Sequence, residues 1–127
     1  MEFEPYTIAK SSQMNIGTLS GLLTAQIVCN NDQLHREIEY GFASDLMSDV
    51  LTLDTDKVVL LTGLANIQAI RTAEMSDISC VVFVRNKKAS AEMIRVAQES
   101  GIVLLEFTGT MFKAVSILSQ AGIKPVY

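Results

Sequence analysis

One pattern recurs three times after residue 56: a run of four apolar residues, a turn rich in small polar residues, and a segment with helical spacing. The apolar runs occupy residues 58–61, 81–84 and 102–105. Four consecutive apolar residues are typical of a strand that is buried on both faces of a parallel sheet. The pattern therefore predicts three β-α units in one α/β domain of three layers, with a mostly parallel sheet between two layers of helices.

The turns that follow the three runs are the first place to look for a binding site. The carboxyl ends of parallel strands meet at one edge of the sheet, where open α/β folds bind their ligands. A glycine or a helix start at that edge can hold an anion, because free backbone N–H groups point outward there. The candidate ligand-binding residues in these turns, with two carboxylates that could reach over them, are Thr62, Gly63, Asn66, Asn86, Lys87, Thr108, Gly109, Asp45 and Asp49.

Polar caps and glycines set the limits of the three helices. Asn66, Ser90 and either Thr108 or Thr110 are placed to cap their first turns. Gly101 lies where the second of these helices should end. In the last helix, the apolar residues predicted to face inward are Phe112, Val115, Ile117 and Leu118.

The first half of the domain has shorter elements. Residues 14–16 are predicted as a short strand or an approach segment and residues 25–29 as a strand, with a short amphipathic helix over 17–23 between them. Residues 37–43 alternate apolar and polar side chains, which predicts a single strand with one face in water. A short helix capped by Ser44 or Asp45 should follow, with Leu46, Met47, Val50 and Leu51 on its inner side.

Asp45 and Asp49 are four residues apart, so a helix through both would place their carboxylates on one face. Such a pair could bind a divalent cation or carry out acid/base chemistry. Two carboxylates alone provide too few ligands to hold Mg²⁺ or Ca²⁺ tightly. We therefore expect no metal site and no cofactor.

The composition limits the class of protein. A chain of 127 residues, 49% hydrophobic and with a net charge of −4, is too apolar to be disordered. It is also too acidic to bind the phosphate backbone of a nucleic acid. The densest basic cluster is Arg85, Lys87 and Lys88, which is interpreted as a solvated loop. We expect one domain over residues 14–127, preceded by a flexible extension over residues 1–13.

No apolar segment approaches the length of about 20 residues that is needed to cross a bilayer, and residues 1–5 lack the pattern of a signal peptide. The sequence therefore predicts a cytoplasmic protein with no membrane partner. Cys29 and Cys80 lie inside apolar stretches without metal-binding spacing, which favours two buried thiols. His35 is the only histidine, and neither cysteine has an evident base partner, so no catalytic set is recognisable.

Residues 34–41 (Leu-His-Arg-Glu-Ile-Glu-Tyr-Gly) and 43–50 (Ala-Ser-Asp-Leu-Met-Ser-Asp-Val) resemble the signature region of the DRTGG domain. In that family an Asp-Arg turn leads into a Thr-Gly-Gly strand and then a Ser-Asp-Leu-Leu-Ser-Asp-Val segment. Thr62 and Asn66 also match family positions, and the resemblance extends from Met14 to Ile123. The chain departs from the family where it has His35 in place of Asp, and Glu39-Tyr40 in place of Thr-Gly.

The resemblance implies a fold like the N-terminal domain of HPr kinase/phosphorylase. Domains of this family also occur fused to phosphotransacetylases and to CBS-domain proteins, and a regulatory or ligand-sensing role is implied. HPr kinase carries its catalysis in a separate domain with a P-loop, and this chain has no G-x-x-x-x-G-K-[ST] pattern. The resemblance therefore implies a domain that is not an enzyme by itself.

Three functions remain open at this stage. The favoured one is a regulatory domain that senses a small phosphorylated or nucleotide ligand at the carboxyl edge of the sheet. The alternative is a homodimeric protein-interaction module without a small ligand, for which the resemblance and a mean hydropathy of +0.30 are the grounds. The third is an enzyme that uses a metal at Asp45 and Asp49.

Overall fold

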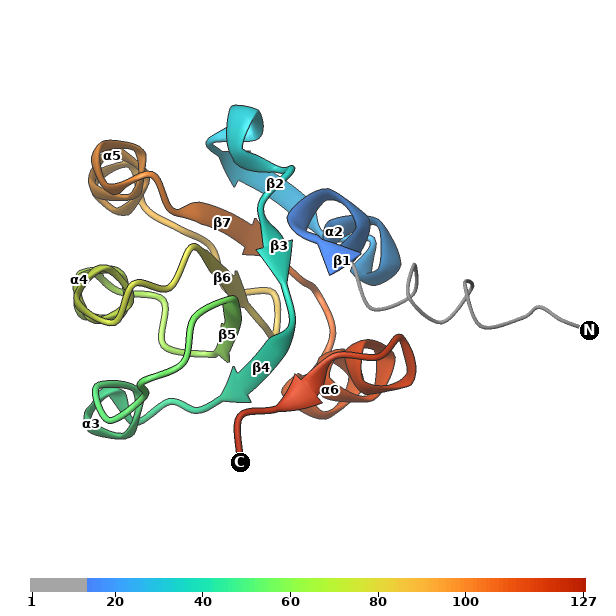
Figure 1. The fold of residues 1–127 in the computed structure, drawn as a ribbon. Helices are drawn as coiled ribbons and strands as arrows, with labels where there is room; N and C mark the ends of the chain where they lie inside the picture. Colours follow the sequence, from blue (N-terminus) through green and yellow to red (C-terminus); the bar gives the residue numbers. More distant parts are fainter. Residues whose placement is uncertain (1–13) are drawn as a thin grey trace, which may run out of the picture.

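The computed structural model describes residues 14–127, so the extension predicted over residues 1–13 lies outside the described part. A mostly parallel sheet lies between two layers of helices, which confirms the predicted α/β class (Figure 1). In chain order the elements are β1 (Met14–Asn15), α2 (Ile16–Leu23), β2 (Gln26–Cys29), the 3₁₀ turn η1 (Asn31–Gln33), β3 (Glu37–Ile38), β4 (Tyr40–Ala43), α3 (Met47–Val50), β5 (Val58–Thr62), α4 (Ile67–Met75), β6 (Cys80–Phe83), α5 (Ala91–Ser100), β7 (Val103–Glu106), α6 (Met111–Gln120) and β8 (Lys124–Pro125).

The six-stranded sheet has the order β2-β7-β6-β5-β4-β8. The strands from β7 to β8 in that order run parallel, and only β2 is antiparallel, at the edge beside β7. The three apolar runs become β5, β6 and β7 in the middle of the sheet, with β6 starting one residue earlier and β7 one residue later than predicted. All residues of β5 and β6 are buried, as a strand covered on both faces requires.

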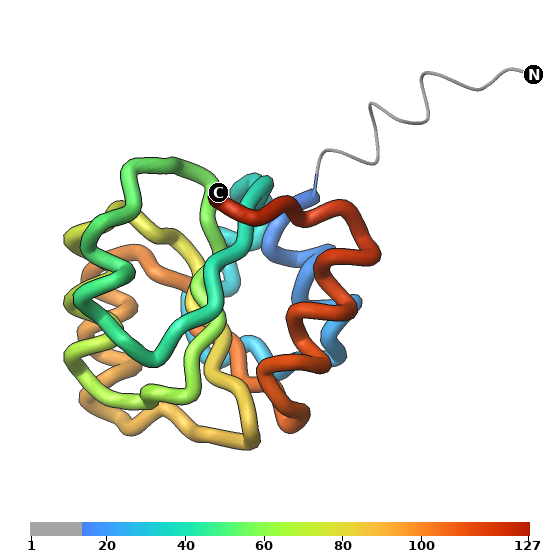
Figure 2. The backbone as a smooth tube through the Cα atoms, turned by 90° about the horizontal axis from the view of Figure 1, so that it is seen from below, coloured from blue at the N-terminus to red at the C-terminus, as the bar shows by residue number. Residues whose placement is uncertain are grey.

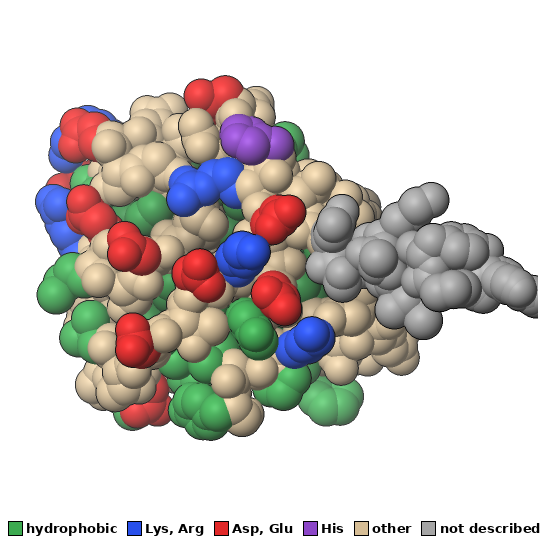
Figure 3. All heavy atoms as spheres, in the orientation of Figure 1, with side chains coloured by type: hydrophobic (Ala, Val, Ile, Leu, Met, Phe, Trp, Pro, Cys, Tyr) green, Lys and Arg blue, Asp and Glu red, His purple; other side chains and the backbone are tan. Residues whose placement is uncertain are grey.

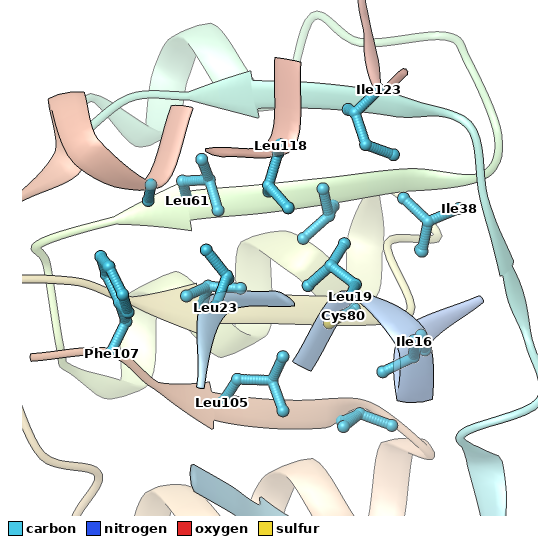
Figure 4. Close-up of a cluster of buried hydrophobic side chains, with 14 of the residues drawn as sticks. Ile16, Leu19, Leu23, Ile38, Leu61, Cys80, Leu105, Phe107, Leu118 and Ile123 are labelled. Atoms are coloured by element: carbon cyan, nitrogen blue, oxygen red, sulfur yellow. The ribbon is translucent and has the colours of Figure 1, made fainter. Parts of the chain in front are cut away.

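Two hydrophobic clusters fill the space on either side of the sheet. Helices α3, α4 and α5 cover one face, and α2 and α6 cover the other (Figures 1 and 2). Successive residues of a strand alternate between the clusters: Leu60 packs toward α4 and α5, whereas Leu61 packs toward α2 and α6. Figure 4 shows the second cluster, which contains Leu61 of β5, Leu19 of α2 and Leu118 of α6.

The prediction of one strand over residues 37–43 is wrong. The segment forms two short strands, because β3 pairs with β1 in a separate two-stranded sheet and β4 enters the main sheet between β5 and β8. The break falls at Glu39, whose carbonyl accepts a hydrogen bond from Lys124 N–H at 3.1 Å. Its carboxylate also pairs with Lys124 Nζ at 3.6 Å. Alternation along a sequence gives the faces of a strand but not its neighbours, so it could not show this change of partner.

The predicted helix after β4 is also shorter than expected. Helix α3 covers only Met47–Val50 and has no side-chain cap, because Asp45 turns toward β5 and Ser44 Oγ accepts from the N–H of Leu46 at 3.0 Å. Leu46 is 58% exposed, so its predicted inward position is wrong, and Leu51 is exposed as well. Met47 and Val50 are buried as predicted.

The caps of the three long helices agree with the sequence. Asn66 Oδ1 accepts from Ala69 N–H at 3.0 Å and Ser90 Oγ accepts from Met93 N–H at 3.2 Å. Thr110, rather than Thr108, caps α6. The predicted inner face of α6 is wrong at Phe112 and Val115, which are exposed, because Ala114 and Leu118 provide the buried side.

Asn30 joins the end of β2 to the end of α5. Its backbone is left-handed, with φ 63°, and its Nδ2 donates to the carbonyls of Ala97 at 3.1 Å and Ile102 at 2.7 Å. We expect Asn30→Ala to lower the free energy of unfolding by about 2 kcal/mol, because two carbonyls lose their donor and alanine resists a positive φ. Asn30→Gly should lose less, since glycine adopts this backbone freely. Urea unfolding measures both, and equal losses in the two variants would exclude the backbone contribution.

Cys29 and Cys80 are buried and unpaired, as the sequence predicts. Burial raises the pKa of both thiols. Because their pKa values are raised, the thiols of the native protein hold their protons more tightly than those of the unfolded chain. The burial of the neutral thiols therefore contributes fully to stability below the ordinary thiol pKa of 9.0, and this contribution is lost as the pH rises above it. We therefore expect the folded protein to react slowly with Ellman's reagent at pH 8 and to lose stability above pH 9. Rapid labelling of both thiols without unfolding would contradict this.

None of the helices in residues 14–127 has the length and apolar character needed to span a bilayer.

Candidate functional site

The turns after β5, β6 and β7 lie side by side at the carboxyl edge of the sheet, along the lower edge of Figure 2. Backbone hydrogen bonds join them, from Val84 N–H to the carbonyl of Thr62 at 3.0 Å and from Arg85 N–H to the carbonyl of Gly109 at 2.7 Å. Three segments that are distant in the sequence therefore form one continuous surface at this edge. Most of the candidate binding residues are placed on it.

A carboxylate lies at the end of β5. Asp45 Oδ1 accepts a hydrogen bond from the hydroxyl of Thr62 at 3.0 Å and from the N–H of Gly63 at 2.7 Å. The Thr62 side chain is fully buried, and its Oγ1 also accepts from Leu64 N–H at 3.1 Å. The two donors that the sequence analysis assigned to an anionic ligand are therefore engaged by an anion of the protein itself.

Arg85 and Asn86 form a strained turn after β6. Both have φ 60°, and the N–H of Lys87 bonds to the carbonyl of Val84 at 3.3 Å across them. A left-handed backbone is tolerated by asparagine but costs about 1 kcal/mol or more at a residue such as arginine. The turn directs the guanidinium of Arg85 over Gly63, where its Cζ would lie 3.8 Å from a Cβ at that position.

Arg85 and Asp45 both lie close to Gly63. A Cβ built on Gly63 would lie 3.5 Å from each carboxylate oxygen of Asp45 and 3.8 Å from Arg85 Cζ. A guanidinium and a carboxylate thus flank the backbone at the end of β5, with no side chain between them. Residues 14–127 contain no ion pair between these two groups within 4.0 Å, so the guanidinium keeps donors for another acceptor.

The other cations of the edge differ in how they are paired. Lys88 Nζ lies 3.6 Å from the carboxylate of Glu106, which also accepts from Ala89 N–H at 2.8 Å, so Lys88 anchors its own loop. Lys87 is exposed and has no acidic partner within 4.0 Å among the described residues. Lys113 is also exposed, is likewise without such a partner in the part of the chain that the structure describes, and runs past Gly109, where a Cβ would lie 3.3 Å from its Cδ.

The remaining candidate residues either have a structural role or lie away from the turns at the carboxyl edge. Asn66 Oδ1 caps α4, and Gly109 lies so close to the ring of Phe107 that a Cβ would approach it to 2.7 Å. Thr108 is exposed in the same turn. Asp49 is exposed on α3, whereas Asp45 lies outside that helix, so the predicted shared helical face of the two carboxylates is wrong. Within residues 14–127, no three His, Cys, Asp or Glu side chains form a group that could hold a metal ion.

Sequence reasoning did not assign Arg85 to the site. Its signal was the basic cluster with Lys87 and Lys88, which was interpreted as a solvated loop. The left-handed backbone of Arg85, which Thr24, Asn30, Lys57, Asp77 and Asn86 also adopt, has no sequence signature at arginine, because such a turn would ordinarily be expected at asparagine or glycine.

The opposite, amino edge of the sheet has a different chemical character. A hollow of about 560 Å³ there is lined by the acidic side chains of Glu39, Asp54, Asp56 and Asp77. Figure 3 shows this face, on which red acidic side chains gather around a few basic ones and the histidine. A second, apolar groove of about 260 Å³ lies between β4, β8 and α6. The acidic lining of the amino edge therefore repels anions, whereas the exposed cations Arg85, Lys87 and Lys113 lie at the carboxyl edge.

Neither a family model nor a curated protein matches this sequence. Among solved structures, the chain is similar to the CBS and DRTGG domains of the regulatory region of Clostridium perfringens pyrophosphatase, in complex with the activator diadenosine tetraphosphate. The TM-score is 0.70 over 98% of this chain, at 14% sequence identity. This chain spans about half (53%) of the length of that one. The comparison supports the DRTGG-like fold that residues 34–50 predict.

Proposed function

We propose that this domain is a non-catalytic regulatory module that senses a phosphorylated small molecule of the nucleotide class at the carboxyl edge of its sheet. The observation that carries the proposal is the strained turn that directs Arg85 over Gly63. Strain of this kind persists where the surrounding structure enforces it, and it gathers at ligand sites. Lys87 and Lys113 add two further cations without acidic partners in residues 14–127, although the whole chain has a net charge of −4.

The chemistry of these groups favours phosphate over other acceptors. A guanidinium offers a planar fork of donors that matches two phosphoryl oxygens, and an ammonium group supplies a point charge. The similar solved structure is a regulatory region in complex with a dinucleotide polyphosphate, which supports the nucleotide class of the ligand. The predicted cytoplasmic location agrees with such a ligand.

A non-catalytic role is supported by where the reactive groups lie. His35, the only histidine of the chain, lines a hollow with Asp56 and Asp77 at the amino edge, far from the cationic turns. Both cysteines are buried with raised pKa values, so they are poor nucleophiles. The carboxyl edge thus presents cations that can bind an anion, while the histidine and both cysteines lie elsewhere.

Thermal unfolding with a set of ligands tests the proposal. Diadenosine tetraphosphate, ATP, ADP and inorganic pyrophosphate are compared with adenosine and with sodium sulfate at equal ionic strength. We expect the polyphosphates to raise Tm by several degrees, because a ligand at 100 times its Kd stabilises the native state by about 2.7 kcal/mol. Adenosine and sulfate should have little effect. If all six compounds behave alike, the proposed function is wrong.

Self-association through α6 is the second candidate function, and it is favoured by one specific observation. Phe112 is 84% exposed on this helix, and the exposed Val115 beside it lines the apolar groove against β4 and β8. Two exposed apolar side chains three residues apart on one helix, next to an apolar groove, form a patch of the kind that a partner surface can cover. Light scattering after size exclusion should show a dimer that Phe112→Ser converts to a monomer. A wild-type protein that is monomeric at high concentration would exclude this candidate.

A further inference from the structure

We infer that Asp45 is an internal competitor for the phosphoryl group of the ligand, an inference that rests on the proposed function. Its carboxylate takes the two donors at the end of β5, at 2.7 Å from Gly63 N and 3.0 Å from Thr62 Oγ1. Ligand binding exchanges this carboxylate for a phosphoryl oxygen. Asp45 thereby sets the affinity of the site and reports its occupation.

The donors themselves require an acceptor. Thr62 is fully buried, so its hydroxyl proton cannot be satisfied by bulk water, and the N–H of Gly63 points at the same carboxylate oxygen. A buried donor without a partner is costly, so an acceptor must occupy this place whether or not a ligand is bound. A carboxylate oxygen and a phosphoryl oxygen both meet this requirement, because either can accept the hydrogen bonds of both donors.

The charges around Gly63 disfavour the presence of both anions at once and favour the phosphoryl group over the carboxylate. A phosphoryl group that approached beside a bound Asp45 carboxylate would meet a like charge at short range. Arg85, on the other side of Gly63, attracts either anion, and a phosphoryl group has the larger charge and offers more oxygens to the guanidinium. The favourable arrangement therefore places the phosphoryl group between Arg85 and Gly63, with Asp45 displaced.

Asp45 is placed where it can move. It is exposed and lies in the connection between β4 and α3, outside both elements. Two sets of contacts hold this connection to β5: the backbone N–H of Ser44 donates to the carbonyl of Leu61 at 3.0 Å, and the carboxylate of Asp45 accepts from Thr62 and Gly63. Release of the carboxylate would leave Ser44 bonded to Leu61 and Met47 buried, so the residues free to shift are Asp45 itself and Leu46, an exposed apolar residue at the start of α3. Occupation of the site is in this way transmitted to an apolar surface that a partner can contact.

Calorimetric titration with inorganic pyrophosphate tests the inference on four forms of the full chain: wild type, Asp45→Ala, Asp45→Asn and Asp49→Ala. The last is a matched control, because it removes the same charge from the same segment without freeing a donor at the edge. We expect Asp45→Ala to bind pyrophosphate about tenfold more tightly than the wild type. Asp45→Asn should fall between the two, since an amide oxygen accepts the same hydrogen bonds without the charge. Asp49→Ala should stay within about threefold of the wild type.

Each result has a definite meaning. If Asp45→Ala binds no more tightly than Asp49→Ala, or more weakly than the wild type, Asp45 is not a competitor, while the proposed function stands. If Asp45→Ala does not fold, the comparison of Asp45→Asn with Asp49→Ala decides in the same way. If none of the four proteins binds pyrophosphate or diadenosine tetraphosphate, both the inference and the proposed function are wrong.

Discussion

Replacing Arg85 with alanine is expected to remove half or more of the stabilisation by polyphosphate ligands. The guanidinium lies over Gly63 and makes no ion pair within residues 14–127, so its donors are available to the ligand. A hydrogen bond to a charged group contributes about 1.5–3 kcal/mol, and the loss of a bidentate pair should weaken binding by about 10-fold to 100-fold. Calorimetry with diadenosine tetraphosphate measures the change in Kd.

Arg95→Ala provides the matched control for this prediction. Arg95 is an exposed arginine of α5 and pairs with Glu99 at 3.4 Å, so its replacement changes the net charge equally but leaves the carboxyl edge intact. We expect its Kd to stay within about twofold of the wild type, because a distant exposed charge is screened by salt. Equal effects of Arg85→Ala and Arg95→Ala would mean that the ligand responds only to overall charge.

Arg85→Gly separates binding from stability at the same position. Glycine adopts a φ of 60° without strain, so this variant should lose the ligand and yet be up to about 1 kcal/mol more stable than Arg85→Ala. If Arg85→Gly is also more stable than the wild type, the gain in stability with a loss of binding is the pattern expected where a strained residue is kept for a ligand. Lower stability of Arg85→Gly than of Arg85→Ala would show that the backbone at this turn is not strained.

Replacing Phe83 with alanine is expected to cause the largest loss of stability. Phe83 is the largest of the fully buried side chains among the described residues, and it lies at the end of β6 in the cluster beneath α4 and α5. Removal of a buried phenylalanine ring costs about 3–5 kcal/mol, because burial is lost and a cavity remains. A domain of this size is typically stable by about 5–15 kcal/mol, so Phe83→Ala should be at the limit of folding at 37 °C.

Two further variants serve as controls for the loss of stability in Phe83→Ala. Phe83→Leu keeps most of the volume and should lose about 1 kcal/mol or a little more. Met75→Ala at the end of α4, where the side chain is 73% exposed, should change stability by no more than about 0.5 kcal/mol. Urea unfolding followed by circular dichroism measures all three. If Phe83→Ala and Met75→Ala unfold at the same urea concentration, the packing between β6 and the helices is not as described.

The parts of the fold that could be predicted are those whose causes are local. Four apolar residues in a row required strands buried on both faces, and β5, β6 and β7 lie within one residue of their predicted places. Asn66 and Ser90 cap the helices they were expected to cap, because a side chain bonds to a backbone N–H only three residues away.

The errors arose where tertiary contacts decide. The segment 37–43 has one uniform alternation, but it changes sheets at Glu39, where the pairing of β3 with β1 ends and the pairing of β4 with β5 and β8 begins. In α6, apolar residues occur on more than one face of the helix. The face with Ala114 and Leu118 packs on the sheet, whereas Phe112 is exposed. Neither choice can be read from periodicity alone.

The candidate site could be located from the sequence but not assembled. The topology of β-α units predicted which edge would gather the turns after β5, β6 and β7. The contact between Asp45 and Thr62 joins residues 17 apart, and it depends on the departure of Asp45 from its expected helix. Arg85 entered the site only through its backbone conformation and its position over Gly63.

The most direct test of ligand binding at the carboxyl edge is a titration of the isotope-labelled protein with diadenosine tetraphosphate, followed by amide NMR shifts. We predict that the largest changes fall on Gly63, Arg85, Lys87 and Gly109, which the structure brings together in three adjacent turns. Changes confined to the acidic amino edge around Asp54 and Asp77, or no changes at saturating ligand, would contradict the account.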